Sequence, residues 1–254
     1  MAGTMATAFE VRLARSPEDL LAAQRLRYDV FVTELGGGGE LVDHQRRLER
    51  DRFDPFFDHL LLIDTATDRI VGVYRLMRAD RAAEAGGFYS AAEYDLAPLL
   101  RSGRRLLELG RSCLHFDYRG GIGLHHLWSG LADYVAEHEI EILFGVASFH
   151  GTDADALAAP LSLLHHRHLA PPELRVRARD RAYQEMNLIP EAQLDRRGAM
   201  QQMPGLIKAY LRLGGVVGEG AFVDYAFNTT DICLILDTER LSERQARIYA
   251  GGAR

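Results

Sequence analysis

The chain has few cysteines and no long apolar run. Its two cysteines, Cys113 and Cys233, lie far apart in the sequence, each within an apolar stretch, so we expect reduced, buried thiols. No apolar run approaches the ~20 residues that span a bilayer. Residues 1–8 lack the charged and apolar parts of a signal peptide. We therefore expect a cytoplasmic protein without a transmembrane helix.

A net basic charge is also missing. The sequence has 30 Lys and Arg against 36 Asp and Glu, a formal net charge of -6. Nucleic-acid-binding proteins present a net basic surface or a concentrated basic stripe, so nucleic acid is excluded as the main partner. The 254 residues are 47% hydrophobic and 26% charged, which is typical of a globular protein and favours one domain with elaborations.

The segment Leu106–His115 has the apolar character of a buried strand and carries one acid and one base, Glu108 and Arg111. A glycine-rich turn follows at Gly120–Gly123, and apolar residues then recur at helical spacing up to His138. The first N–H groups of such a helix can meet an anion, although the same glycine pattern occurs in ordinary tight turns. Strand, turn and helix together predict a cofactor site.

The remaining chain alternates between strand-like and helix-like patterns. A helix is predicted to begin at a Ser16 cap with Pro17 in its first turn, and to end before the glycines at 36–39. Further strands are predicted over 9–14, 59–64, 70–77, 142–147, 221–227 and 231–236, and further helices over 153–168, 204–213 and 239–249.

These residues resemble a known superfamily. The spaced set Arg27-x-x-x-Phe31, Asp51-x-x-Asp54, Arg75 and Glu108-x-x-Arg111 is similar to the pattern of acyl-homoserine lactone synthases, within the GNAT superfamily of N-acyltransferases. The strings 107–113, 128–134 and 143–151 resemble the bacterial ornithine N-alpha-acyltransferases more closely. Two features depart from the wider pattern. The tryptophan that the synthases carry after the phenylalanine is absent. The glycine-rich turn is also out of phase with the superfamily motif Arg/Gln-x-x-Gly-x-Gly, because Tyr118 occupies the first position of that motif.

The resemblance implies an α/β (α+β) fold, GNAT-like, with a mixed, largely antiparallel central sheet flanked by helices and a C-terminal extension. It implies a single domain over 1–254, with its core over 9–150 and an acceptor and C-terminal elaboration over 151–254. The implied reaction transfers a 3-hydroxyacyl group from acyl carrier protein to the α-amine of L-ornithine, giving lyso-ornithine lipid. Acyl carrier protein and ornithine are then the partners, no cofactor is tightly bound, and the lipid product brings peripheral contact with the inner membrane.

Other functions remain open at this point. Relatives on the same scaffold acylate glutamine, glycine or lysine, and a lactone synthase would use S-adenosylmethionine. A non-catalytic module that binds an acyl carrier protein is a third class. The adjacent histidines His165, His166 and His168 do not converge on one ion from a helix, and we expect no metal.

Glu108 is the candidate general base. An amine that attacks a thioester must be neutral, while the α-amine of an amino acid is mostly protonated at neutral pH, so a carboxylate acting directly or through a water is useful. Arg111 and Arg75 complete the candidate catalytic set. The alternative is a structural ion pair of Glu108 with either arginine, and the two roles can coexist.

Arg27, Phe31, Asp51 and Asp54 form a second candidate set, for substrate binding or for a structural network. The two aspartates could contact a cationic amino acid. We favour a network, because three arginines, with Arg75 and Arg111 included, nearly balance the two aspartates and Glu108 in charge.

The donor is expected to be held in two places. The single phosphate of a phosphopantetheine arm needs few N–H donors, and the turn formed by Arg119, Gly120, Gly121, Ile122 and Gly123 would supply them. Carrier proteins are acidic, so an acidic enzyme needs a local basic landing surface. Arg175, Arg177 and Arg179 stand at every second position and are the candidates, the alternative being a solvated arginine run.

Overall fold

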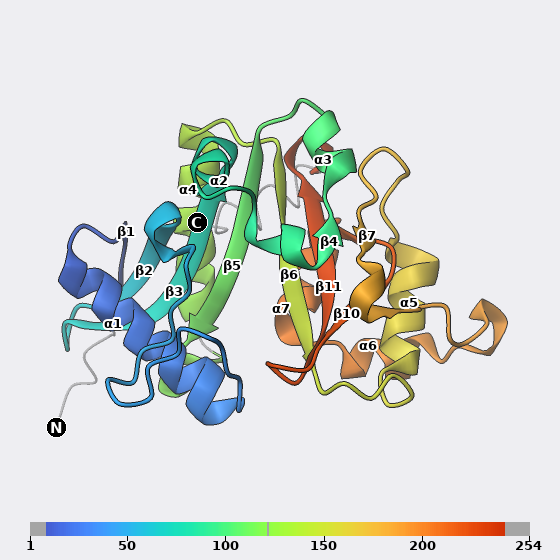
Figure 1. Ribbon diagram of the computed structural model, residues 1–254, viewed down its shortest axis with the longest axis horizontal. Helices are drawn as coiled ribbons and strands as arrows, with labels where there is room; N and C mark the ends of the chain where they lie inside the picture. The colour runs from blue at the N-terminus through green and yellow to red at the C-terminus, as the bar shows by residue number, and fades with distance from the viewer. Residues whose placement is uncertain (1–8, 121, 242–254) are drawn as a thin grey trace, which may run out of the picture. The chain divides into compact units, whose positions relative to one another are not determined.

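The computed structural model describes residues 9–120 and 122–241 (Figure 1). The chain divides into two compact units. The first unit takes the described residues of Met1–Leu76 and Gly110–His138, and the second those of Met77–Leu109 and Glu139–Ile248. The boundary falls within one strand, β5 (Leu106–Leu114), which contributes residues to both. The expected division at residue 150 stays a prediction.

The first unit contains a sheet in which β1, β2, β3 and the second half of β5 are neighbours. The β1–β2 and β2–β3 pairs are antiparallel. The elements are β1 (Phe9–Leu13), α1 (Pro17–Arg27), the π-helix η1 (Tyr28–Glu34), the 3-10 turn η2 (Asp54–Phe56), β2 (Asp58–Asp64), β3 (Arg69–Arg78), the 3-10 turn η4 (Phe116–Tyr118) and α4 (Gly123–Glu137).

Alternation along β2 decides which helix covers which face of this sheet. Leu61 and Ile63 belong to one apolar cluster with Leu26 of α1. Leu60 and Leu62 point to the opposite face, where a Cβ on Gly130 of α4 would lie 3.4 Å from Leu60. Figure 1 shows α1 and α4 on opposite faces of β2 and β3. Each fully buried leucine contributes about 2 kcal/mol to the stability of the fold. The leucines of β2 therefore hold α1 against one face of the sheet and α4 against the other.

Helix α1 begins as predicted. The Ser16 hydroxyl accepts from the backbone N–H of Asp19 at 3.2 Å, and Pro17 occupies the first turn. The regular helix ends at Arg27, however, and the chain continues to Glu34 as a π-helix, a rare form that is often found at functional sites.

The second unit contains the strand order β5-β6-β11-β10-β8, with β9 paired to β11, and a separate pair formed by β4 and β7. Its strands are β4 (Tyr94–Asp95), β6 (Ile142–His150), β7 (Arg177–Ala178), β8 (Tyr183–Gln184), β9 (Val216–Val217), β10 (Ala221–Asp224) and β11 (Thr229–Asp237). Its helices are α2 (Ala79–Glu84), α3 (Ala97–Arg101), α5 (Ala158–His168), α6 (Arg196–Gln202) and α7 (Gly205–Arg212), and its 3-10 turns are η3 (Tyr89–Ala92), η5 (Asp180–Ala182), η6 (Glu191–Gln193) and η7 (Thr238–Arg240).

Strand β6 has a parallel neighbour on one side and an antiparallel neighbour on the other. Its register with β5 is parallel and runs from Leu106–Ile142 to Glu108–Phe144. Its register with β11 is antiparallel along the whole strand. The sheet is thus mixed and largely antiparallel, which confirms the predicted fold class.

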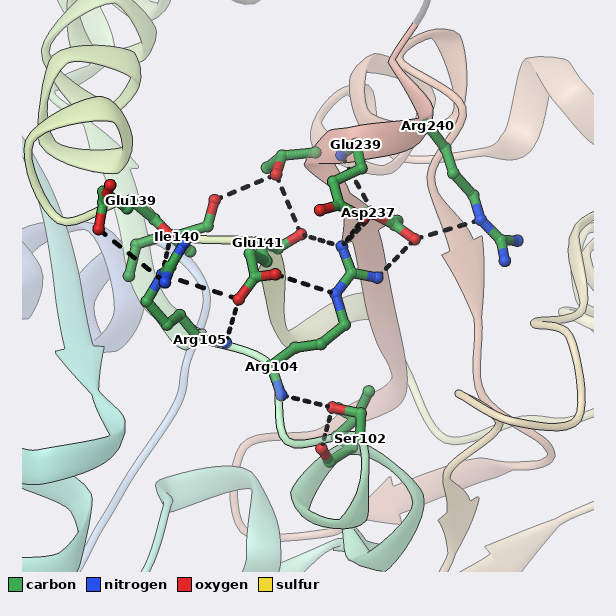
Figure 2. A network of polar contacts seen from close by, with 11 residues as sticks. Ser102, Arg104, Arg105, Glu139, Ile140, Glu141, Asp237, Glu239 and Arg240 are labelled. Carbon is green, nitrogen blue, oxygen red and sulfur yellow. Dashed lines mark hydrogen bonds and ion pairs between the residues drawn. The ribbon is translucent and has the colours of Figure 1, made fainter.

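A polar network joins the ends of three strands in the second unit (Figure 2). Arg104, just before β5, donates to both carboxylate oxygens of Asp237 at the end of β11, at 2.8 and 2.7 Å. The same guanidinium donates to the carbonyl oxygen of Glu141, just before β6, at 3.3 Å. Burial raises the pKa of Asp237, but the Arg104 guanidinium outweighs it and lowers that pKa below its usual range. The network fastens β5, β6 and β11 at one end.

Two local predictions are wrong or only partly tested. The helix predicted over 153–168 begins at Ala158, because the Asp153 carboxylate caps a turn by accepting from the N–H of Asp155 at 3.0 Å. Of the helix predicted over 239–249, residues 242–249 lie outside the described residues. Among the helices that the structure describes, none is long and apolar enough to span a bilayer.

Candidate active site

A buried ion-pair network lies in the first unit, and Asp54 is its centre. This carboxylate stands on the η2 turn and is only 4% exposed. It accepts from Arg27 Nη1 at 2.6 Å, from Arg75 Nη1 at 2.8 Å and from Gln24 Nε2 at 2.9 Å. Burial alone would raise the pKa of Asp54, but the two guanidinium groups hold it far below its usual range. This low pKa keeps Asp54 ionised at neutral pH.

Glu49 links two arginines of this network. Its carboxylate is 1% exposed and accepts from Arg27 Nε at 2.5 Å and from Arg111 Nε at 3.1 Å. Burial raises the pKa of Glu49, but Arg111 and Arg27 outweigh it and lower the pKa to about 2. The sequence analysis missed this residue, which stands in a charged segment without periodicity.

Asp51 completes the network at its more exposed side. It lies 2.8 Å from Arg75 Nη1 and 3.6 Å from Arg111 Nη2. Among the described residues of the first unit, three arginines thus face three carboxylates, and the formal charges cancel. Such balance is what lets ions remain buried, because each desolvated charge keeps a partner. The geometry supports the structural network for Asp51 and Asp54.

Two aromatic rings lie beside the arginines. The Arg75 guanidinium carbon is 4.2 Å from the ring centroid of Phe57, and that of Arg111 is 5.9 Å from the ring centroid of Phe31. Phe31 stands on the π-helix η1 and packs against the apolar cluster beneath α1. Arg111 itself takes φ = 50°, an uncommon value for a residue other than glycine. The predicted set Arg27, Phe31, Asp51, Asp54, Arg75 and Arg111 is thus brought together within one unit.

His59 is a further residue that sequence reasoning missed. Its ring is 5% exposed, and its Nε2 lies 3.1 Å from the carbonyl oxygen of Asp54. Burial lowers the pKa of His59 to about 4, despite the nearby Asp54 carboxylate. A neutral imidazole therefore sits beside the network at neutral pH. Gln24 could have been found, because it precedes Arg27 by three positions and shares its helix face.

Glu108 lies in the second unit, where it accepts hydrogen bonds from the η3 turn. Its carboxylate is 1% exposed. Oε1 accepts from the backbone N–H and the hydroxyl of Ser90 at 2.6 and 2.5 Å, and Oε2 accepts from the N–H of Tyr89 at 2.7 Å. Both donors belong to the η3 turn, which no pattern in the sequence analysis singled out.

The glycine-rich turn leads into α4, in the first unit. Arg119 Nη2 pairs with Glu34 at 2.7 Å, and Gly120 takes φ = 75°. Gly121 lies outside the described residues. Ile122 is 59% exposed and precedes Gly123, the first residue of α4, whose first turn carries no acidic side chain. A phosphate would meet no repulsive charge in that turn.

The arginine run lies in the second unit and makes local contacts. Arg175 Nε donates to the carbonyl oxygen of Ala170 at 2.8 Å, and Arg179 Nε donates to that of Ala91 at 2.7 Å. Arg177 Nη1 pairs with Asp180 at 2.6 Å, while its side chain remains 45% exposed. The landing surface stays a prediction.

Among the described residues, one group of three carboxylates is close enough to share a metal ion. The group consists of Glu93, Asp224 and Asp231, which each place one oxygen within 4.8 Å of the others. The histidines His165, His166 and His168 form no such group in the part of the chain that the structure describes. His166 Nε2 instead lies 2.9 Å from the carbonyl oxygen of Ile189.

The mixed sheet, together with the family match that follows, places the protein in the class of GNAT-type acyltransferases. Residues 26–129 match the family model described as an acetyltransferase (GNAT) domain. The chain is 62% identical over 246 residues to the L-ornithine N(alpha)-acyltransferase of Rhodobacter capsulatus, covering 95% of this chain and 94% of that protein. It is 45% identical to the Brucella abortus protein of the same name, covering 96% of this chain and 89% of that one. The chain therefore belongs to the L-ornithine N(alpha)-acyltransferase family.

Solved structures with the same fold are distant in sequence. FeeM, an N-acyl amino acid synthase from uncultured soil microbes, aligns with a TM-score of 0.53 at 12% identity, covering 92% of this chain and 93% of FeeM. The acyl-homoserine lactone synthase LasI aligns with a TM-score of 0.51 at 15% identity, covering 98% of this chain and 97% of LasI. These likenesses support the fold alone.

Proposed function

We propose that this protein transfers an acyl group to the α-amine of L-ornithine, the first step of ornithine lipid synthesis. The observation that carries the proposal is the 62% identity to the Rhodobacter capsulatus enzyme over 95% of the chain.

The reaction balances as an aminolysis of a thioester. The ornithine α-ammonium loses one proton, the neutral nitrogen attacks the thioester carbonyl, and a C–N bond forms as the C–S bond breaks. The thiol of the donor leaves with a proton, and one proton is released overall. We assign the first deprotonation to Glu108, directly or through a water, because it is a buried carboxylate whose orientation is held by three donors.

The buried ion pairs supply rigidity in this proposal. Arg75 and Arg111, although predicted from sequence as catalytic, each contact carboxylates of the first-unit network. In this proposal the two arginines hold β3 and β5 against the segment that carries Glu49, Asp51 and Asp54.

We further propose that the donor is a 3-hydroxyacyl group on acyl carrier protein. The turn from Arg119 to Gly123 would meet the phosphate of the phosphopantetheine arm, and the first turn of α4 adds no negative charge there. Arg175, Arg177 and Arg179 would contact the acidic carrier, because a chain of net charge -6 needs a local basic surface for that encounter. A cytoplasmic location, with membrane contact through the lipid product, fits this donor.

The test presents the purified protein with 3-hydroxyacyl carrier protein and, separately, ornithine, lysine, glutamine and glycine. We expect thiol release and a product with the mass of N-acylornithine only with ornithine. Release with another amino acid would reassign the acceptor. Binding of S-adenosylmethionine by calorimetry, with no acylornithine formed, would assign a lactone synthase. Carrier binding without thiol release would assign a non-catalytic module.

A further inference from the structure

The η3 turn closes over Glu108 in the second unit. Gly86 and Gly87, with φ = 80° and 135°, end α2 and turn the chain back. Phe88 then packs edge to face on Phe144, with ring centroids 5.0 Å apart. Phe144 is the residue of β6 that stands in register with Glu108. The turn is thereby placed directly over the β5–β6 pair that carries the carboxylate.

Ser90 is the residue of this turn that contacts Glu108 most extensively. It is fully buried, and its N–H and hydroxyl both donate to Oε1, at 2.6 and 2.5 Å. The N–H of Tyr89 donates to Oε2 at 2.7 Å. Hydrogen bonds to a charged group in a dry site are about twice as strong as neutral ones. A carboxylate held at both oxygens is restricted to one orientation.

The other end of the turn is held by the arginine run. Arg179 donates from Nε to the carbonyl oxygen of Ala91 at 2.7 Å and from its backbone N–H to that of Glu93 at 2.8 Å. Arg181 Nη2 donates to the carbonyl oxygen of Ala92 at 2.8 Å. The donors of η3 thus face Glu108, while its carbonyl groups accept from two arginines.

We propose that Ser90 is a positioning residue for Glu108, and that Arg179 and Arg181 support it by fixing the η3 turn. This inference rests on the proposed function, in which Glu108 accepts the proton of the ornithine amine. Ser90 fixes the orientation of the carboxylate and stabilises its charged form. The arginine run then has an internal role that is separate from any contact with a carrier protein.

The test compares Ser90→Ala, Ser90→Thr and Ser162→Ala in steady-state acylation of ornithine over a pH range. Ser162 is the matched control, because it is also a fully buried serine of the second unit, with its hydroxyl bonded to Met186, Leu188 and Ile189. For Ser90→Ala we expect kcat to fall about ten-fold or more, with an unchanged KM for the acyl donor. The acid limb of the pH profile should move up by about one unit, because a carboxylate that has lost a donor is protonated more easily.

Ser90→Thr keeps the hydroxyl and should restore most of the activity and the wild-type pH profile. Ser162→Ala should lose stability without moving the acid limb. The inference is overturned if folded Ser90→Ala keeps the wild-type kcat and pH profile, or if it loses activity only in proportion to lost folded protein, as Ser162→Ala would. A wild-type protein that does not acylate ornithine would instead overturn the proposed function.

Arg179→Ala tests the far end of the turn. We expect a smaller decrease in kcat and an upward shift of the same acid limb, both insensitive to salt. A change confined to the KM for a carrier-linked donor, and lost at high salt, would assign Arg179 to the carrier surface and overturn the supporting role.

Discussion

At the scale of single residues, the protein keeps its chemistry-bearing side chains buried. Arg27 and Arg75 have no exposure, and Glu49 and Asp54 are 1% and 4% exposed. A buried ion pair is not a strong source of net stability, but breaking one leaves an uncompensated charge at a cost of about 3–5 kcal/mol. Substitutions inside the network should therefore be much more costly than those in surface pairs.

Asp54→Asn is the direct test of the network. The variant removes the anion that Arg27 and Arg75 share, so we expect the free energy of unfolding to fall by about 3 kcal/mol or more and acyl transfer to be lost. Denaturant titration measures the first and the ornithine assay the second. The matched control is Asp29→Asn, whose partner Arg47 is 58% exposed, and this should cost less than ~1 kcal/mol. Full activity in Asp54→Asn would exclude both the network and a substrate contact.

His59 should make stability depend on pH. Its pKa is about 4 in the folded protein and about 6.5 when unfolded, so the unfolded chain binds more protons between these values. The contribution of His59 to the free energy of unfolding should be constant above pH 6.5. As the pH drops from 6.5 to 4, this contribution should fall by up to about 3 kcal/mol. Below pH 4.5, Glu49, with its pKa lowered to about 2, adds a loss of the same sign.

The variant His59→Gln isolates this contribution, because its amide nitrogen can replace Nε2. Denaturant titrations at several pH values should show a flatter dependence between pH 6.5 and 4 than in wild type. The exposed His150 provides the control variant His150→Gln, which should retain the wild-type slope. An unchanged slope in His59→Gln would show that folding does not lower the pKa of His59.

At the scale of elements, the approach of β5 to β6 depends on one glycine. A Cβ added to Gly145 would lie 2.2 Å from the carbonyl oxygen of Leu109, which is backbone and cannot rotate away. The two strands are in parallel register only from Leu106–Ile142 to Glu108–Phe144. Gly145 thus permits β5 and β6 to approach closely just after Glu108 and Phe144, the last pair in parallel register.

Gly145→Ala should force the two strands apart and lower the free energy of unfolding by about 3 kcal/mol. Gly110→Ala is the matched control on β5, because its Cβ would meet only Arg75 atoms at 3.8 Å, an ordinary contact. We expect a change within about 0.5 kcal/mol for that control. Equal stabilities of the two variants in denaturant titrations would rule out the steric argument.

At the scale of the whole molecule, a net charge of -6 opposes the approach of an acidic carrier protein. An exposed arginine run can offset this locally, although Arg177 already pairs with Asp180 and Glu219. The arginine run should therefore affect the rate of encounter with the carrier, and salt should screen this effect. The chemical step should change little.

Arg177→Glu tests this contribution. We expect the KM for a carrier-linked donor to rise about five-fold at low salt, with kcat unchanged, and the difference to shrink at 0.5 M salt. Arg196→Glu introduces the same charge change in the same unit, at a side chain that is 55% exposed, and should leave KM near the wild-type value. Equal KM values for the two variants at low salt would exclude a landing surface at Arg177.

Much of the fold followed from local patterns. The Ser16 cap and the apolar runs of β2 and β6 are properties of neighbouring residues, so they could be predicted without tertiary contacts. The end of the regular helix at Arg27 could not, because a π-helix has no distinct periodic signature in a short segment.

The sequence alone determined the class of fold, the family resemblance and six members of the ion-pair and aromatic set, because these six residues belong to the spaced motif that carries the resemblance. Only the tertiary structure brought in Glu49, Gln24 and His59, and paired Glu108 with Ser90 across 18 positions of the chain. The physical reason is that a buried charge is stabilised by whatever donor the fold places beside it, and such a partner leaves no mark in local spacing.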